Sequence, residues 1–109
     1  MPYTTADLAS EVLTELRVLA ADETPSAADS QAVITRYTRI LPFLEMRGVA
    51  AWAETSIPDP YFIPLVRYIA ALCAPMFGRE YMDDEQALIM LRSVAIRPYQ
   101  GEVTEQIDY

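Results

Sequence analysis

The sequence contains no histidine, no lysine and no asparagine, and it has a single cysteine. Histidine is the commonest general base in enzymes and the commonest neutral metal ligand, so its absence argues against acid–base catalysis and against a histidine metal site. The lone Cys73 excludes an internal disulfide and a zinc site built from several thiolates. We therefore expect no enzyme activity, no metal centre and no cofactor.

Glycine is also scarce, with three residues at positions 48, 78 and 101. They are too few and too scattered for a Gly-rich loop that binds phosphate. Positive charge is scarce as well: the chain has eight arginines and sixteen acidic residues, and its formal net charge is −8. Affinity for nucleic acid comes mainly from cations that neutralise phosphate, so we expect no tight nucleic-acid binding. We expect no binding to anionic membrane surfaces and no signal peptide either.

The longest apolar stretch runs from Tyr61 to Gly78 and follows Asp59, which can cap a helix, and a proline suited to the first helical turn. Apolar residues at three- and four-residue steps, widened by alanines, predict a helix at 60–77 with neighbours on several sides. A membrane span is the alternative by length, but Arg67 and two internal prolines argue against it.

Three further helices are predicted from polar capping residues followed by apolar residues at helical spacing. Gly48 can end the second of them, and Pro98 can end the last. Pro42 lies inside the second pattern and predicts a kink or a break there. The capping pairs are Thr4 with Asp7, Ser26 with Asp29, and Asp83 with Gln86. The four expected helices span residues 5–20, 27–47, 60–77 and 84–96.

These helices predict an all-α fold, a small four-helix bundle at residues 1–97 with an extended C-terminal arm at 98–109. Residues 99–109 show a two-residue alternation of apolar and polar side chains, which is typical of an extended strand. A single strand has nothing to pair with in a helical protein, so we expect the arm to add to a partner chain. A disordered tail is the alternative interpretation.

The segment 49–60 has no sustained period and predicts a loop of about a dozen residues, which is uncommon in a compact domain unless the loop has a function. Its Trp52 either packs on its own bundle or anchors a partner. We expect the loop to lie at an interface. The expected interface residues are Trp52, Ile57, Tyr99, Val103, Ile107 and Tyr109.

The order of motifs carries a resemblance to known proteins over about residues 5–97. The motifs are a first helix DLASEVLTELRVL, a second helix ending FLEMRGVAAW, the stretch IPDPYFIPLVRYIAALCAPMFG, and a last helix containing ALIMLRSVA. Together they resemble the head-to-tail adaptor proteins of tailed phages, in the packaged-DNA stabilisation or tail accessory factor group. The connectors of long-tailed phages, which are also small helical bundles, are a close alternative.

This resemblance implies a structural protein that forms a ring, a dodecamer in this group, between the portal and the tail and helps to retain packaged DNA. The implied partners are the portal protein, a tail or nozzle protein, and further copies of the chain. The implied location is the head–tail junction of a virion that is assembled in the host cytoplasm.

The alternative from another functional class is a small acidic inhibitor or antitoxin that imitates DNA with its carboxylates. The acidic residues here are spread over caps and exposed helix faces and are not massed in one block, which argues against it. An adaptor needs no active site and can use an acidic surface to keep DNA from binding tightly in a channel.

Overall fold

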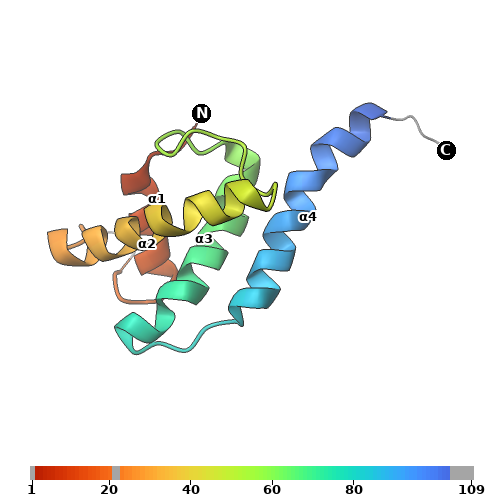
Figure 1. Cartoon of the computed structure of the whole chain (residues 1–109). Coiled ribbons are helices and arrows are strands. Elements are labelled where there is room, and N and C mark those ends of the chain that lie inside the picture. The colour runs from red at the N-terminus through yellow and green to blue at the C-terminus, as the bar shows by residue number, and fades with distance from the viewer. Residues whose placement is uncertain (1, 21–22, 104–109) are drawn as a thin grey trace.

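The computed structural model describes residues 2–20 and 23–103 of the chain, with side chains described up to Val94. Within these residues the elements are α1 (Thr5–Glu15), α2 (Ala27–Met46), α3 (Asp59–Cys73), the 3₁₀ helix η1 (Ala74–Phe77) and α4 (Asp84–Val103) (Figure 1). Extended pairing in this part of the chain is limited to two isolated bridges, Tyr3 with Ile57 and Ala53 with Ser56. The predicted all-α fold with four helices is confirmed.

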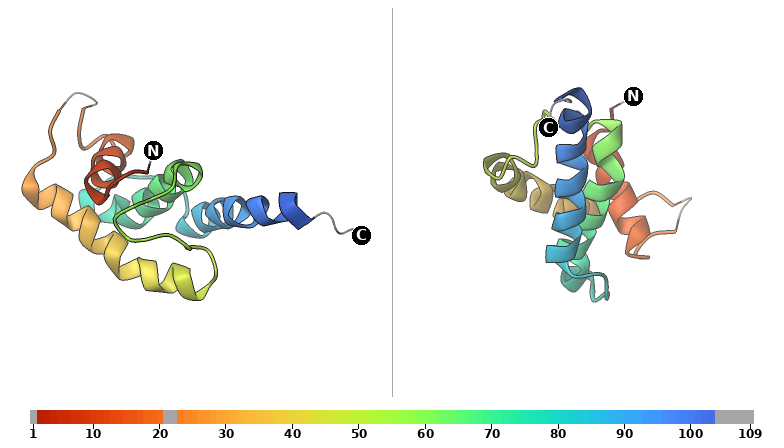
Figure 2. Two further views of the ribbon diagram at one scale, coloured as in Figure 1. Left: turned by 90° about the horizontal axis from the view of Figure 1, so that it is seen from above. Right: turned by 90° about the vertical axis from the view of Figure 1, so that its right-hand side faces the viewer.

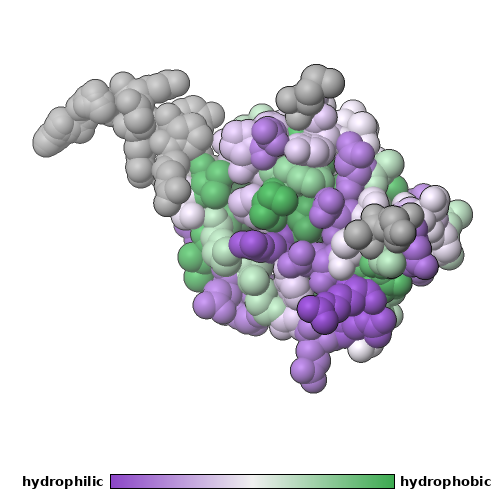
Figure 3. All heavy atoms as spheres, turned by 180° about the vertical axis from the view of Figure 1, so that it is seen from behind, coloured by the Kyte–Doolittle hydropathy of each residue, from purple (hydrophilic) through white to green (hydrophobic). Residues whose placement is uncertain are grey.

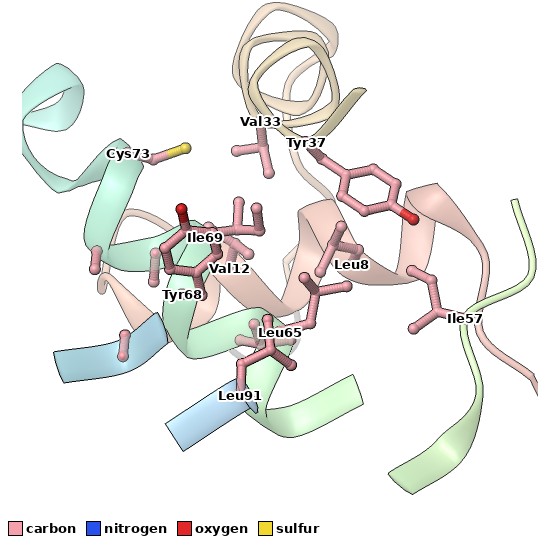
Figure 4. Packing of buried hydrophobic residues seen from close by; sticks show 14 of the residues in the cluster. Leu8, Val12, Val33, Tyr37, Ile57, Leu65, Tyr68, Ile69, Cys73 and Leu91 are labelled. Atoms are coloured by element: carbon pink, nitrogen blue, oxygen red, sulfur yellow. The ribbon is translucent and has the colours of Figure 1, made fainter. Parts of the chain in front are cut away.

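Helix α3 is the centre of the fold, because it contacts α1, α2 and α4. Eight of its residues are buried, as the near-continuous apolar sequence predicts. Figure 4 shows side chains of α1 and α2, among them Leu8, Val12 and Val33, turned towards the side chains of α3. Burial of this cluster supplies the main driving force for folding.

The stretch Asp59–Phe77 is long and apolar enough to cross a membrane by length and composition alone. The core helix of a globular protein has the same properties, and here three other helices pack around it. On the face drawn in Figure 3, polar side chains are interspersed with small apolar groups, without a continuous apolar band. The interpretation as a central core helix is the one that fits this packing.

The helices are arranged in two directions. Helices α3 and α4 lie side by side and antiparallel, and α2 crosses the others at a steep angle (Figure 1). Helices α1 and α2 contact each other and lie on opposite sides of the molecule (Figure 2). The C-terminal part of α4 projects beyond the other helices (Figures 1 and 2).

The predicted caps begin α1 and α2. The Asp7 amide donates to Thr4 Oγ1 at 3.1 Å and the Thr4 amide donates to Asp7 Oδ2 at 2.9 Å, which completes a capping box. The Asp29 amide donates to Ser26 Oγ at 3.1 Å. Gly48 ends α2 in the left-handed conformation with φ 73°, as predicted.

Helix α1 ends five residues earlier than predicted, at Glu15 and not at residue 20. Arg17 takes the left-handed conformation, φ 62°, and the amides of Arg17 and Val18 turn back to the carbonyls of Thr14 and Leu13. This is the Schellman arrangement that glycine usually provides. The apolar stripe of the sequence continues past the helix because the following turn also packs on the core.

Arg79 stabilises the end of α1, where Arg17 takes a conformation usually found for glycine. Its Nε donates to the carbonyl oxygen of Leu16 at 3.1 Å, and its Nη2 donates to that of Arg17 at 3.3 Å. A cation bound to the last carbonyls of a helix is favoured by the helix dipole as well as by the hydrogen bonds. The connection between η1 and α4 is thereby fixed to the end of α1.

Two prolines and one cap bear on the prediction. Pro42 lies inside α2, which continues as one helix, so of the two alternatives, a kink or a break, the break is absent. Pro58 occupies the N-cap position of α3, so Asp59 lies in the first turn and is not the cap. Helix α4 continues through Pro98 to Val103, because a proline removes one hydrogen bond and crowds one turn without necessarily ending a helix.

Candidate functional site

Trp52 lies in the core of its own chain, with 8% of its surface exposed. Its indole Nε1 donates to the Tyr37 hydroxyl at 3.1 Å, and that hydroxyl donates to the carbonyl oxygen of Glu54 at 2.9 Å. The ring also packs on Tyr61, with the ring centroids 5.1 Å apart. Burial raises the pKa of Tyr37 above its ordinary value, which keeps the hydroxyl protonated as a donor.

Ile57 is fully buried in the same core. Its backbone pairs with Tyr3 through two hydrogen bonds, Tyr3 N to Ile57 O at 2.9 Å and Ile57 N to Tyr3 O at 2.8 Å. The Tyr3 ring stacks on Phe62, with 3.8 Å between the ring centroids. The N-terminal residues therefore hold the end of the loop onto α3.

These contacts correct the expectation that Trp52 and Ile57 anchor a partner. A side chain that is almost fully covered by its own chain has little surface left for another protein, and the alternative interpretation, packing on its own bundle, holds. Tyr99 and Val103 lie in α4, so the predicted extended arm is wrong up to Val103, where the backbone is helical. Their side chains come after the last described one. Ile107 and Tyr109 lie outside the described residues.

Among the described residues, no group of three or more histidine, cysteine, aspartate or glutamate side chains could hold a metal ion. Cys73 is buried, and burial raises the pKa of its thiol to about 11. The thiol is therefore protonated and shielded near neutral pH, whereas a reactive cysteine needs an exposed thiolate.

An open groove of about 490 Å³ lies between α2, α3 and α4. Helices α2 and α4 both pack on α3 without contacting each other, which leaves the groove between them. We call it the α2–α4 groove. It is lined by Phe43, Arg47, Tyr68, Asp84, Glu85, Leu88, Ile89 and Arg92.

The α2–α4 groove is amphipathic. Its apolar side chains come from all three helices, and two arginines and two carboxylates stand among them. The Arg47 guanidinium lies 5.4 Å from the centroid of the Phe43 ring, in cation–π range. Burial, and then the nearby charge of Asp84, raise the pKa of Tyr68, so its hydroxyl remains a neutral donor.

Apolar side chains near this groove are exposed. Ile89 is 62% exposed on the groove wall, and Met46, near the end of α2, is 80% exposed. Large apolar residues of this kind, rimmed by charges, are typical of protein–protein contact surfaces. The groove is suited to hold apolar side chains of a partner protein, with the charged residues fixing its orientation.

Sequence reasoning missed this groove because its residues come from three helices that are distant in the sequence. A signal was present in α4, where Ile89 and Met90 fall outside the face marked by Ala87 and Leu91. Apolar residues on the outer face of an amphipathic helix indicate a contact surface.

The chain matches no known protein-family model, no curated protein and no solved structure.

Proposed function

We propose that this protein is a structural head-to-tail adaptor of a tailed phage, which forms a ring between portal and tail and helps to retain packaged DNA. The observation that carries the proposal is the combination of a projecting helix and an open groove beside it. Among the described helices, α4 packs on α3 alone, and its C-terminal part projects from the bundle. Residues near the start of α4 form one wall of the α2–α4 groove. The resemblance of the motif order gives this combination its interpretation.

A chain of this size can connect two larger proteins only if it offers more than one contact surface. The end of α4 reaches away from the core and is suited to contact a neighbour at a distance. The α2–α4 groove is suited to receive an apolar segment from a second partner, the portal or a tail protein. An excess of negative charge, −8 in total, disfavours tight binding of DNA that passes along the ring.

Mass measurement of the purified protein, alone and mixed with a candidate portal protein, tests the proposal. We expect small species when the protein is alone and dilute, and a large closed ring on the portal. A ring that never forms with portals, together with a tight one-to-one complex with an enzyme, would instead establish the acidic inhibitor.

Two variants test whether the α2–α4 groove is needed for assembly on the portal. Ile89→Asp places a charge on the groove wall, and we expect it to prevent ring formation on the portal while the chain stays folded. Ile63→Asp is the matched control, because Ile63 is 50% exposed on α3 and is not among the residues that line the groove. Equal loss of assembly in both variants would contradict the role of the groove.

A further inference from the structure

The outer face of α2 carries a second shallow depression, of about 410 Å³, on the side away from the core. Small side chains form its floor, and two arginines and a methionine border it. Arg36 Nη2 donates to the Sδ atom of Met76 at 3.3 Å, which joins α2 to η1 across the depression. It is lined by Ala28, Gln31, Ala32, Thr35, Arg36, Arg39 and Met76. We call this surface the basic face.

The outer face of α1 has the opposite charge. Asp7 and Glu11 are exposed on the side of α1 away from its buried residues. Asp59 begins α3 two residues after Ile57, whose backbone pairs with that of Tyr3 just before α1, so Asp59 lies near the start of α1. A hydrogen bond with Asp59, and then the charges of Asp59, Asp7 and Glu11, raise the pKa of the Tyr3 hydroxyl, which agrees with this placement. We call these three carboxylates the acidic face. Glu15, one turn further, is engaged by the Tyr81 hydroxyl at 2.6 Å.

The two faces lie on different helices, each on the side away from the buried residues of its helix. Helices α1 and α2 contact each other, and neither face contains the residues that they bury. A copy that presents its acidic face to the basic face of the next copy therefore leaves its own basic face free for a third.

We propose that the basic face of one subunit binds the acidic face of the next, and that this head-to-tail contact builds the ring. The inference rests on the proposed function and names the contact between subunits. The occupant is a second copy of this chain because the charges of the two faces are complementary.

The net charge of the chain favours a contact that includes its few cations. Copies that each carry −8 repel one another unless the few cations lie at the contact. The basic face places Arg36 and Arg39 together above apolar floor residues, which is the arrangement that a carboxylate-bearing helix can occupy. A contact between two different faces closes into a ring when its rotation permits, whereas a self-complementary contact stops at a dimer.

Cysteine cross-linking distinguishes these two geometries. In the double variant Thr14→Cys with Gln31→Cys, one new thiol lies on the outer side of α1 and the other on the basic face. A short bismaleimide should then give a ladder of dimers, trimers and larger species at low ionic strength. The buried Cys73 does not react in the folded chain. A control variant pairs Thr14→Cys with Thr55→Cys, in the exposed loop, and should give no ladder.

Charge reversal tests the chemistry of the contact in the same cross-linking background. Arg36→Glu with Arg39→Glu should abolish the ladder, and so should Asp7→Asn with Glu11→Arg, in which the new side-chain amide oxygen at position 7 can still accept the capping bond. An equimolar mixture of the two variants should restore it, since each acidic face then meets a basic one. Circular dichroism checks that both variants are folded, and Glu54→Arg is a control that leaves both faces intact.

Three results would overturn the proposal: cross-linking that stops at dimers, a ladder that survives reversal of both arginines, or no ladder at any protein concentration. The ladder should also disappear at about 1 M salt, where the screening length falls to about 3 Å. These measurements use the protein alone. If the ladder is absent but rings form on portals, the proposed contact is wrong and the adaptor function stands. If the ladder forms but the protein does not bind portals, the contact stands and the adaptor function is wrong.

Discussion

The loop at residues 47–58 and the C-terminal part of α4 behave oppositely to what their local sequences suggest. The loop has no period and carries one large aromatic residue among small and polar ones, yet Trp52 and Ile57 are buried in the core. The end of α4, where the alternating sequence predicted an extended arm, is a regular helix up to Val103 that projects beyond the other helices (Figure 1). Irregular backbone can belong to the core, and regular backbone can lie outside it.

The physical difference is in the partners that each segment finds. The loop contributes an indole, whose N–H needs an acceptor when buried, and α2 supplies the Tyr37 hydroxyl. It also contributes backbone groups that pair with Tyr3. Helix α4 satisfies its own backbone and packs on a single neighbour, so its far part needs nothing from the bundle.

The helix that supports both regions gives the largest expected effect. Ile69 is fully buried in α3, and Ile69→Asp would place an unpaired charge in the core. We expect a loss of more than about 4 kcal/mol in the free energy of unfolding, enough to prevent folding. Circular dichroism and denaturant titration measure it. Ile63→Asp, on the half-exposed side of the same helix, should change stability by about 0.5 kcal/mol at most.

Truncation of the loop aromatic comes next. Trp52→Ala should cost the isolated chain about 3–5 kcal/mol, because it removes a buried aromatic and leaves a cavity. Trp52→Phe keeps most of the packing and loses mainly the hydrogen bond to Tyr37, so its cost should be clearly smaller. Urea unfolding of the two variants separates these terms. An alanine variant as stable as the parent would contradict a core role for Trp52 and favour the interpretation that it contacts a partner.

The sequence was sufficient for the helices that have local start and stop signals. Ser26 and Gly48 mark the start and the end of α2 in the sequence, and α2 begins and ends beside them in the structure. The apolar run likewise marks α3 as the buried helix. The end of α1 was not predictable in this way. Its left-handed residue is Arg17, which has no local preference for that conformation, and the Arg79 that holds it lies far away in the sequence.

The contact surfaces were harder to predict than the helices. The burial of Trp52 depends on Tyr37 and Tyr61, which come from different helices. The α2–α4 groove likewise exists only where Phe43, Tyr68 and Leu88 are brought together by the packing of three helices. Such surfaces are properties of the tertiary structure, and periodicity within one helix does not define them.

Alkaline pH should weaken the core that the loop completes. Burial raises the pKa of Cys73 from 9.0 to about 11 and also raises that of Tyr37. Between about pH 9 and pH 11 the folded chain therefore keeps protons that the unfolded chain loses. The free energy of unfolding should have its highest value below about pH 9 and decrease towards pH 11. Denaturant titrations across this range measure the slope. In Cys73→Ala the slope should be shallower, although stability is lower throughout.

The residue at the start of the loop gives a smaller effect. Gly48 has φ 73°, and a methyl group added there would have no atom within 4 Å. Gly48→Ala should therefore cost only the backbone strain of the left-handed conformation, about 1 kcal/mol. Arg17→Gly should have the opposite sign, with a gain of up to about 1 kcal/mol, because Arg17 already bears that strain. Thermal unfolding of both variants provides the comparison.

Deletion of residues 99–109 should have the smallest effect on folding. Helix α4 is held to the bundle through Ala87 and Leu91, which are both buried and lie well before the deletion. We expect the free energy of unfolding to change by about 0.5 kcal/mol or less, while Leu91→Ala should cost about 2–5 kcal/mol. The truncated protein should stay helical and lose its ability to join portals. A loss of several kcal/mol on deletion would mean that the end of α4 is part of the core and not a free contact segment.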